Sequence, residues 1–194
     1  MSFLYDNKFF FSAYQIFIKG VNHISDEEIL SWVGITDYEF IPVSDNDYQN
    51  FNTDQFEEHL YITECSEWKH ILDDACGYFL YNKHLDLILN QGIDVIKQIG
   101  EKYNVLSCSN GDATDDYEII YYKDGKLKRK FKVDCYDWVN LEVTEDYGEP
   151  LPGENKKIRQ DFHLPYLMSV VESMGININH DLQKIRLYAK KDKN

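Results

Sequence analysis

Apolar and polar residues recur along this chain with two periods: a period of two residues, which predicts strands, and a period of 3.6 residues, which predicts helices. Side chains alternate between the two faces of a strand, so a period of two predicts a strand. Segments with this pattern that are long enough to form a strand occur at residues 9–19, 59–64, 104–108, 117–122, 126–134 and 184–189. Residues 68–81 predict a further strand. Within the first strand we expect Ile16 and Ile18 to face away from Phe17.

The first helix is predicted by the residues at its two ends. Ser25, with Glu28 three residues later, forms a capping box, which satisfies backbone N–H groups at a helix start. Ile24 and Ile29 stand at the positions of a hydrophobic staple, and Gly34 is placed to end the helix. Its first turn contains three acidic residues that the helix dipole stabilises by about 0.3–1 kcal/mol each: Asp26, Glu27 and Glu28.

Two later stretches follow the helical period of 3.6 residues. Between 85 and 102, spacings of three and four predict one continuous helix with a single apolar stripe: Leu85, Ile88, Leu89, Ile93, Ile96 and Ile99. Gly92 lies on this stripe, where it would allow close packing. The last helix has Pro165 near its first turn and Gly175 after its end. Its inward side would carry Leu164, Leu167, Met168 and Val171.

Turn residues join these elements in a mixed order of helices and strands. A tight turn at 123–125 predicts a β-hairpin over 117–134, and the glycines and prolines of 144–156 predict a loop. We expect one α+β domain over residues 1–194, with a mostly antiparallel sheet and about three to four helices packed on it. Its parts would be an acidic N-terminal part at 20–68, the hairpin, the loop, and a C-terminal helix and strand at 162–190.

The second strand of that hairpin is predicted to carry a basic stripe. Alternation places one set of residues on one face, namely Lys126, Lys128, Lys130 and Lys132, and another set on the opposite face, namely Leu127, Arg129, Phe131 and Val133. The lysines would either pair with the acidic half of the chain or form a second contact surface. On an edge strand they would also discourage aggregation between sheets.

Charge is distributed unevenly along the chain. Residues 20–67 contain twelve acidic residues and no Lys or Arg, and the formal net charge of the 194 residues is −14. A concentrated negative field speeds association with a basic partner. Acidic loops with aromatic anchors are typical of protein-binding surfaces, although the same aromatics could simply be buried in the core. The candidate partner-binding residues are Asp45, Asp47, Tyr48, Phe51, Asp54, Glu57 and Glu58.

The same composition argues against several kinds of partner and location. Binding to nucleic acid or to an anionic membrane requires clustered cations, so we expect neither as a direct partner. The apolar run at 9–17 is too short to span a bilayer. The four cysteines are widely spaced and form no C-x-x-C pair, which favours buried free thiols in a reducing cytoplasm: Cys65, Cys76, Cys108 and Cys135.

Motifs for catalysis, metals and cofactors do not emerge from the sequence. It contains no nucleophile elbow, P-loop or dinucleotide fingerprint. The acidic cluster at 112–118 does not match the ligand spacing of a calcium loop, and we interpret it as a turn ordered by side-chain hydrogen bonds. We therefore predict no catalytic residue, metal site or cofactor, while an active site assembled from distant residues stays open.

Two segments resemble small bacterial immunity proteins of polymorphic-toxin and contact-dependent inhibition systems. One is WKHILDDACGYFLY at 68–81, and the other is GDATDDYEIIYYKDGKLKRKF at 111–131. The resemblance implies a cytoplasmic protein that binds one cognate toxin, often by covering the toxin's active site. Those proteins are diverse in fold, so no functional residue is transferred by motif. An acidic inhibitor of a basic nuclease toxin would agree with the charge pattern.

Three functional hypotheses follow from these observations. The first is a non-enzymatic immunity protein that neutralises a basic toxin. The second is a nucleic-acid mimic that occupies several DNA- or RNA-binding proteins, whereas an immunity protein should select one. The third is a small enzyme whose site carries no motif. The sequence leaves the oligomeric state open.

Overall fold

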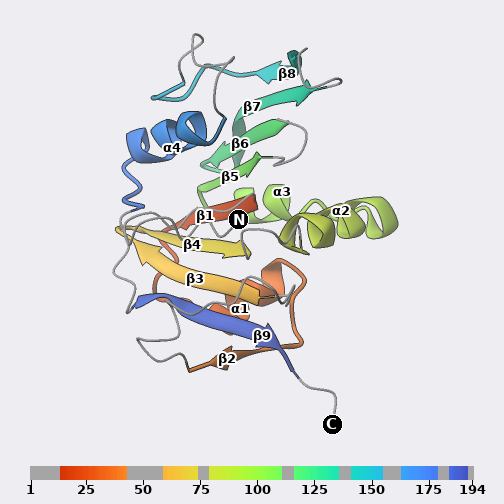
Figure 1. Ribbon diagram of the computed structural model, residues 1–194, viewed down its shortest axis with the longest axis vertical. Coiled ribbons are helices and arrows are strands. Elements are labelled where there is room, and N and C mark those ends of the chain that lie inside the picture. The colour runs from red at the N-terminus through yellow and green to blue at the C-terminus, as the bar shows by residue number, and fades with distance from the viewer. Residues whose placement is uncertain are drawn as a thin grey trace.

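The computed structural model of the protein describes residues 14–42, 59–73, 79–110, 116–135, 141–154, 163–178 and 184–191. These stretches form nine strands and four helices (Figure 1). The strands are β1 (Tyr14–Lys19), β2 (Tyr38–Ile41), β3 (His59–Cys65), β4 (Trp68–Asp73), β5 (Val105–Asn110), β6 (Tyr117–Lys123), β7 (Lys126–Cys135), β8 (Leu141–Tyr147) and β9 (Arg186–Lys190). The helices are α1 (Asp26–Trp32), α2 (Phe79–Gln91), α3 (Val95–Gly100) and α4 (His163–Ser173).

All nine strands belong to one sheet, in which every neighbouring pair is antiparallel. Their order is β2-β9-β3-β4-β1-β5-β6-β7-β8. The C-terminal strand β9 inserts between β2 and β3, and β2 and β8 lie at opposite ends of the sheet (Figure 1). The predicted α+β class, with a mostly antiparallel sheet and three to four helices, is confirmed.

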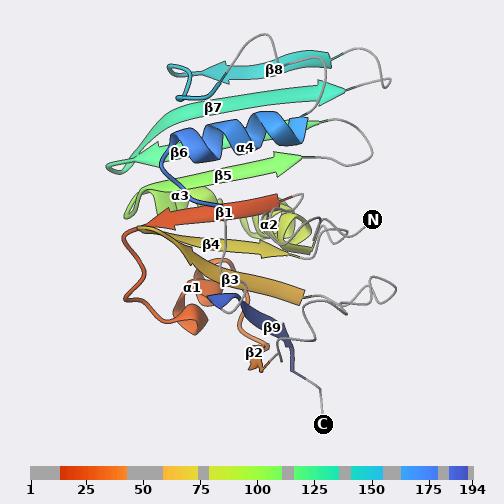
Figure 2. The same cartoon turned by 60° about the vertical axis from the view of Figure 1, so that its left-hand side comes forward.

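Helices cover both faces of this sheet. On one face, α1, α2 and α3 bury a core that includes Ile16 and Ile18 of β1. On the other face, α4 lies over β5 and β6 and buries a second core that includes Phe17 (Figure 2). The predicted alternation along β1 is therefore confirmed. It explains why this strand is apolar on both sides, as a strand between two helical layers must be.

The predicted ends of the first helix are also confirmed. The Oγ atom of Ser25 accepts a hydrogen bond from the N–H group of Glu28 at 3.2 Å, which caps α1. Ile24 packs against the core cluster that contains Ile29, as the staple requires. Gly34 follows the helix with φ of +76°, a conformation that glycine adopts without steric cost.

The single helix predicted over 85–102 is wrong, because the chain forms α2 and α3 there. Gly92 has φ of +66° and ends the first of them. Asp94 then caps the second, since its Oδ1 atom accepts the N–H hydrogen bond of Lys97 at 2.9 Å. Among the described side chains of α2, those of Leu80 and Leu87 are buried, and Leu89 of the predicted stripe is 77% exposed.

The strand predicted over 68–81 is correct for its first half alone. Strand β4 ends at Asp73, and the chain is helical from Phe79 onward. The buried Asp73 carboxylate accepts a hydrogen bond from the N–H group of Leu80 at 3.1 Å. The Asp73 side chain therefore satisfies a backbone donor in the first turn of α2.

Strands β2 and β8 lie within segments that the sequence did not predict as strands. Strand β2 opens the acidic segment at 37–58, and β8 occupies the first part of the loop predicted at 144–156. Neither shows a regular alternation, because each lies at an end of the sheet, where two of the four residues of β2 and five of the seven residues of β8 are exposed. The turn residues that suggested a loop begin directly after β8 at Gly148.

The basic stripe of β7 differs from its prediction in two respects. Strand β7 lies between β6 and β8 and is not an edge strand. Leu127 pairs with Tyr122 while Arg129 pairs with Tyr121, so a bulge at Lys128 shifts the alternation. Neighbouring residues on β6 face opposite sides, and Leu127 and Arg129 therefore do not share a face.

Two of the stripe's lysines pair within their own region of the sheet. Lys130 Nζ lies 2.8 Å from Glu145 of β8, and Lys132 Nζ lies 2.9 Å from Asp134 of β7. Within the described residues, neither Lys130 nor Lys132 forms an ion pair with an acidic residue of 20–67. These pairs are partly exposed, so each contributes at most about 1 kcal/mol.

Two of the four cysteines can be located in the core. Cys65 and Cys108 are buried free thiols, as predicted for them, and burial raises the pKa of Cys65 to about 12. Cys76 lies outside the described residues. Within the described stretches, no helix has the length and apolar character needed to cross a membrane.

Candidate binding surface

The partner-binding residues predicted from the acidic half all lie outside the described residues. They are Asp45, Asp47, Tyr48, Phe51, Asp54, Glu57 and Glu58. They remain candidates that the structure leaves untested. The described part of the same acidic half contains a buried ionic network. A second acidic region, which the sequence analysis did not predict, lies at one edge of the sheet.

The ionic network joins the acidic half to cations from later in the chain. Asp26 of α1 accepts hydrogen bonds from Lys69 at 2.9 Å, from Tyr188 at 2.9 Å and from the guanidinium of Arg186. Arg186 also binds both carboxylate oxygens of Glu64, at 2.6 and 3.0 Å. Lys69 is 2% exposed, so the network lies in the interior of the protein, where it holds α1 against the sheet.

The network holds the Asp26 carboxylate in its charged form. Burial by itself would raise the pKa of Asp26, but hydrogen bonds from Arg186 and Lys69 outweigh burial and lower that pKa below its ordinary value. The sequence analysis grouped Asp26 with Glu27 and Glu28 as acids of the first helical turn. That grouping is incomplete, because Asp26 is buried whereas Glu27 and Glu28 are exposed. Asp26 is thus a buried structural acid, whereas Glu64 is bound by Arg186 and its side chain remains 31% exposed.

Strand β8 forms an open edge of the sheet. It pairs with β7 on one side, and no other strand of the described residues pairs with it. Five of its seven residues are exposed. Unpaired edge strands present backbone donors and acceptors on which another chain can form hydrogen bonds. We call strand β8 together with Glu149 the acidic edge.

The pairing of β8 with β7 assigns the side chains of the acidic edge to two faces. Val143 pairs with Val133 of the core under α4, whereas Glu145 and Tyr147 pair with Lys132 and Lys130 on the opposite face. The register shifts next to Val143, which leaves Thr144 as an extra residue on β8. As a result, Glu142 lies on the same face as Glu145 and Tyr147. Val143 is 38% exposed and Tyr147 is 57% exposed, so both are apolar surface within an acidic strand.

A buried arginine fixes the end of this strand. The Arg129 side chain, 1% exposed, binds the Glu154 carboxylate through Nε at 2.9 Å and Nη2 at 2.8 Å. Its Nη1 atom donates to Asp146 at 2.6 Å and to the backbone carbonyls of Tyr147 and Gly148, each at 3.1 Å. Arg129 therefore ties β8 and the following loop to β7, which keeps the acidic edge in a defined shape.

Two glycines with positive φ provide a test of how tightly the edge is held. Gly148 has φ of +82°, and an added Cβ atom would come within 1.9 Å of the Lys128 carbonyl oxygen. Gly92 has φ of +66°, but nothing lies within 4 Å of its Cβ position. We expect Gly92→Ala to destabilise the protein by about 1–2 kcal/mol, the cost of the left-handed conformation. Gly148→Ala should cost more because of the backbone overlap. Equal losses in urea unfolding experiments would contradict this.

The acidic edge has a signal in the sequence that was overlooked. Residues 133–155 contain seven acidic residues and no Lys or Arg, which makes them a second cation-free stretch. The glycines and prolines of 144–156 predicted a loop there, so no binding surface was predicted in this stretch. The stretch is recognisable by the same criterion that selected 20–67, but its position on an open sheet edge is not.

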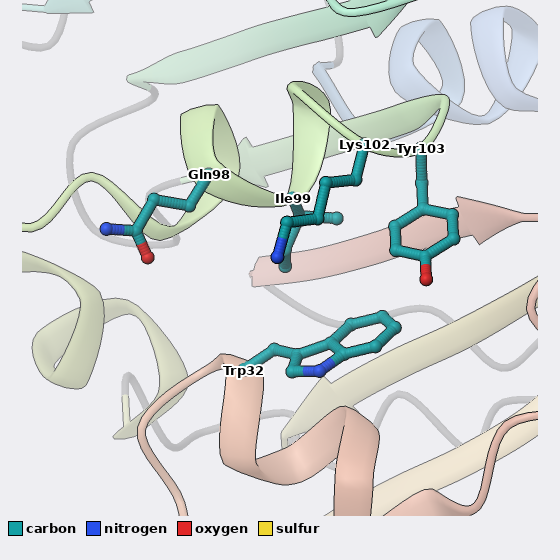
Figure 3. A pocket seen from close by; sticks show the side chains of 5 residues that line it. All are labelled: Trp32, Gln98, Ile99, Lys102 and Tyr103. Carbon is teal, nitrogen blue, oxygen red and sulfur yellow. The ribbon is translucent and has the colours of Figure 1, made fainter.

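A small hollow lies elsewhere, between α1 and the end of α3. It has a volume of about 90 Å³ and is lined by Trp32, Gln98, Ile99, Lys102 and Tyr103. Figure 3 shows Lys102 and Tyr103 extending toward Trp32, whose ring stacks with that of Tyr103 at 5.1 Å between centroids. Pockets for small-molecule ligands usually measure about 300–1,000 Å³. This hollow is therefore too small for a ligand of that size.

The acidic cluster predicted at 112–118 is described only in part. Asp112 and Asp115 lie outside the described residues, while Asp116 and Glu118 lie within them. No group of three or more His, Cys, Asp or Glu residues in the described stretches is arranged to hold a metal ion. Burial raises the pKa of Glu118, although nearby Lys130 and Lys132 offset part of that effect.

In comparisons with family models, with curated proteins and with solved structures, no match to the chain was found. The function is therefore argued from charge, exposure and the architecture of the sheet. Of the described surface, the acidic edge best combines negative charge, exposed apolar side chains and backbone hydrogen-bonding capacity.

Proposed function

We propose that this chain is a non-enzymatic acidic protein that binds a basic protein partner, with an inhibitor of the immunity type as the form that best suits its features. The supporting observation is the acidic edge. Glu142 and Glu149 are exposed there and have no ion pair among the described residues, next to the exposed Tyr147. Apolar anchors within a charged surround are the usual anatomy of a protein-binding surface.

The internal ion pairs also support this function. The cations closest to buried acids, Lys69, Arg129 and Arg186, are all engaged inside the fold. Arg129 also pairs with the exposed Asp146, but none of the three cations neutralises Glu27 or Glu142. The negative field therefore extends into solvent, where it would accelerate association with a cationic partner.

A paired affinity capture tests the proposed function. The immobilised protein would be exposed to lysate from its native cell, and bound proteins would be identified by mass spectrometry. A charge-reversed variant of the acidic edge, Glu142→Lys with Glu149→Lys, would be compared with a control of equal net charge, Glu101→Lys with Glu172→Lys. Both control residues are exposed, and neither belongs to β8.

We expect one basic partner that the control retains and the edge variant loses. The purified pair should associate more slowly as salt increases, because salt screens exposed charges beyond about 8–10 Å. If the partner is toxic to cells, co-expression of this protein should abolish that toxicity. Capture of several unrelated basic proteins would instead favour nucleic-acid mimicry, and absence of any basic partner would contradict the proposal.

A further inference from the structure

We propose that the acidic edge receives an extended basic strand of the partner, which adds to β8 as a tenth strand of the sheet. This inference rests on the proposed function and specifies how the partner is held. Backbone hydrogen bonds would supply affinity, and the side chains of β8 would select the partner's residues.

The open side of β8 provides the backbone part of the interaction. The strand is seven residues long and has β7 as its one neighbour among the described strands. At about 3.4 Å per residue it offers an edge of roughly 24 Å. The strand at the opposite end of the sheet, β2, is four residues long and offers a shorter template.

Charge decides between a basic strand and a second copy of this chain. Two β8 strands side by side would bring Glu142 of each copy near the acids of the other, and Lys130 compensates only Glu145 among them. Like charges opposite one another across a strand pair are destabilising, so self-pairing is opposed. A lysine-bearing or arginine-bearing strand would meet the same carboxylates with opposite charge, and its cations could also lie over the ring of Tyr147.

The two faces of β8 specify the pattern of the added strand. Glu142, Glu145 and Tyr147 share one face, while Leu141 and Val143 share the other. A partner strand alternates its side chains with a period of two. Cations on one face and aliphatic residues on the other would therefore satisfy both sides of the acidic edge.

A synthetic strand tests this inference without knowledge of the natural partner. The probe is a seven-residue peptide that alternates lysine and valine, with blocked ends. Its first control has the same sequence with N-methyl groups on alternate residues, which removes the hydrogen-bond donors of one edge without changing charge. Its second control replaces lysine with glutamate. Calorimetry would measure affinity, and hydrogen exchange would locate protected amides.

We expect the lysine peptide to bind and to protect backbone amides of β8. The edge variant, Glu142→Lys with Glu149→Lys, should lose about tenfold in affinity, whereas Glu101→Lys with Glu172→Lys should lose far less. The N-methylated and glutamate peptides should bind much more weakly. Melting temperatures of both variants would establish that each is folded.

Three results would overturn the inference: equal binding of the N-methylated peptide, protection at a different strand, or no binding at concentrations up to about 1 mM. Equal binding of the N-methylated peptide would reduce the interaction to charge alone. None of these results contradicts the proposed function, because a basic protein could still bind through side chains or through residues 45–58. Failure of the affinity capture would instead contradict the function itself.

Discussion

Replacement of Asp26 by alanine is expected to destabilise the protein by about 3–5 kcal/mol, which would show as a lower urea midpoint of unfolding. The reason is that Lys69, 2% exposed, would keep its charge inside the fold without its carboxylate partner. Arg186 and Tyr188 would lose hydrogen bonds to the same group. A loss this large is characteristic of a broken buried ion pair.

The neighbouring residue provides a matched control for Asp26. Glu27 also lies in the first turn of α1, but it is exposed. Glu27→Ala should therefore cost about 0.3–1 kcal/mol, the value of a favourable interaction with the helix dipole. Similar losses in the two variants would show that Asp26 acts through the dipole and not through the buried network.

The pH dependence of the Asp26 effect has a defined sign. The pKa of Asp26 is lowered in the folded state, so its contribution is complete above the pKa of the unfolded chain, about 3.9. The contribution declines as the pH falls through the lower, folded pKa. The difference in stability between the wild type and Asp26→Ala should thus persist at pH 5 and shrink below about pH 4. A difference that vanished already at pH 6 would contradict the low pKa.

Replacement of Arg129 by methionine is expected to cost a similar 3–5 kcal/mol. Glu154 is 4% exposed and would be left as a buried carboxylate without its cation. The carbonyl groups of Tyr147 and Gly148 would lose a donor as well. Because these residues end β8 and begin the next loop, hydrogen exchange should accelerate at the acidic edge more than in β1.

Two further variants separate the ion pair from the general effect of substitution. Lys128 is exposed and adjacent, so Lys128→Ala should change stability by about 0.5 kcal/mol or less. In the double variant Arg129→Met with Glu154→Met, no buried charge of this pair remains, and much of the lost stability should return. The double variant is compared with Arg129→Met and Glu154→Met made singly. If its loss of stability equalled the sum of those two losses, the result would argue against a coupled pair.

The sequence by itself determined the local features of the fold. The cap at Ser25, the alternation along β1 and the tight hairpin turn were all predictable, because each depends on residues close together in the chain. The turn at Asp124 and Gly125 has positive φ at both residues, as such hairpins require. The α+β class followed from the same patterns.

Only the tertiary structure decided the roles that depend on distant residues. Asp26 and Arg186 are 160 positions apart, so no local pattern could show that this acid is buried with cations while Glu27 is not. The insertion of β9 beside β2, and the position of β8 at an open end, likewise depend on sheet order. Local patterns report which face of an element is apolar. Which elements become neighbours depends on long-range packing, and that packing made β8 an exposed acidic edge.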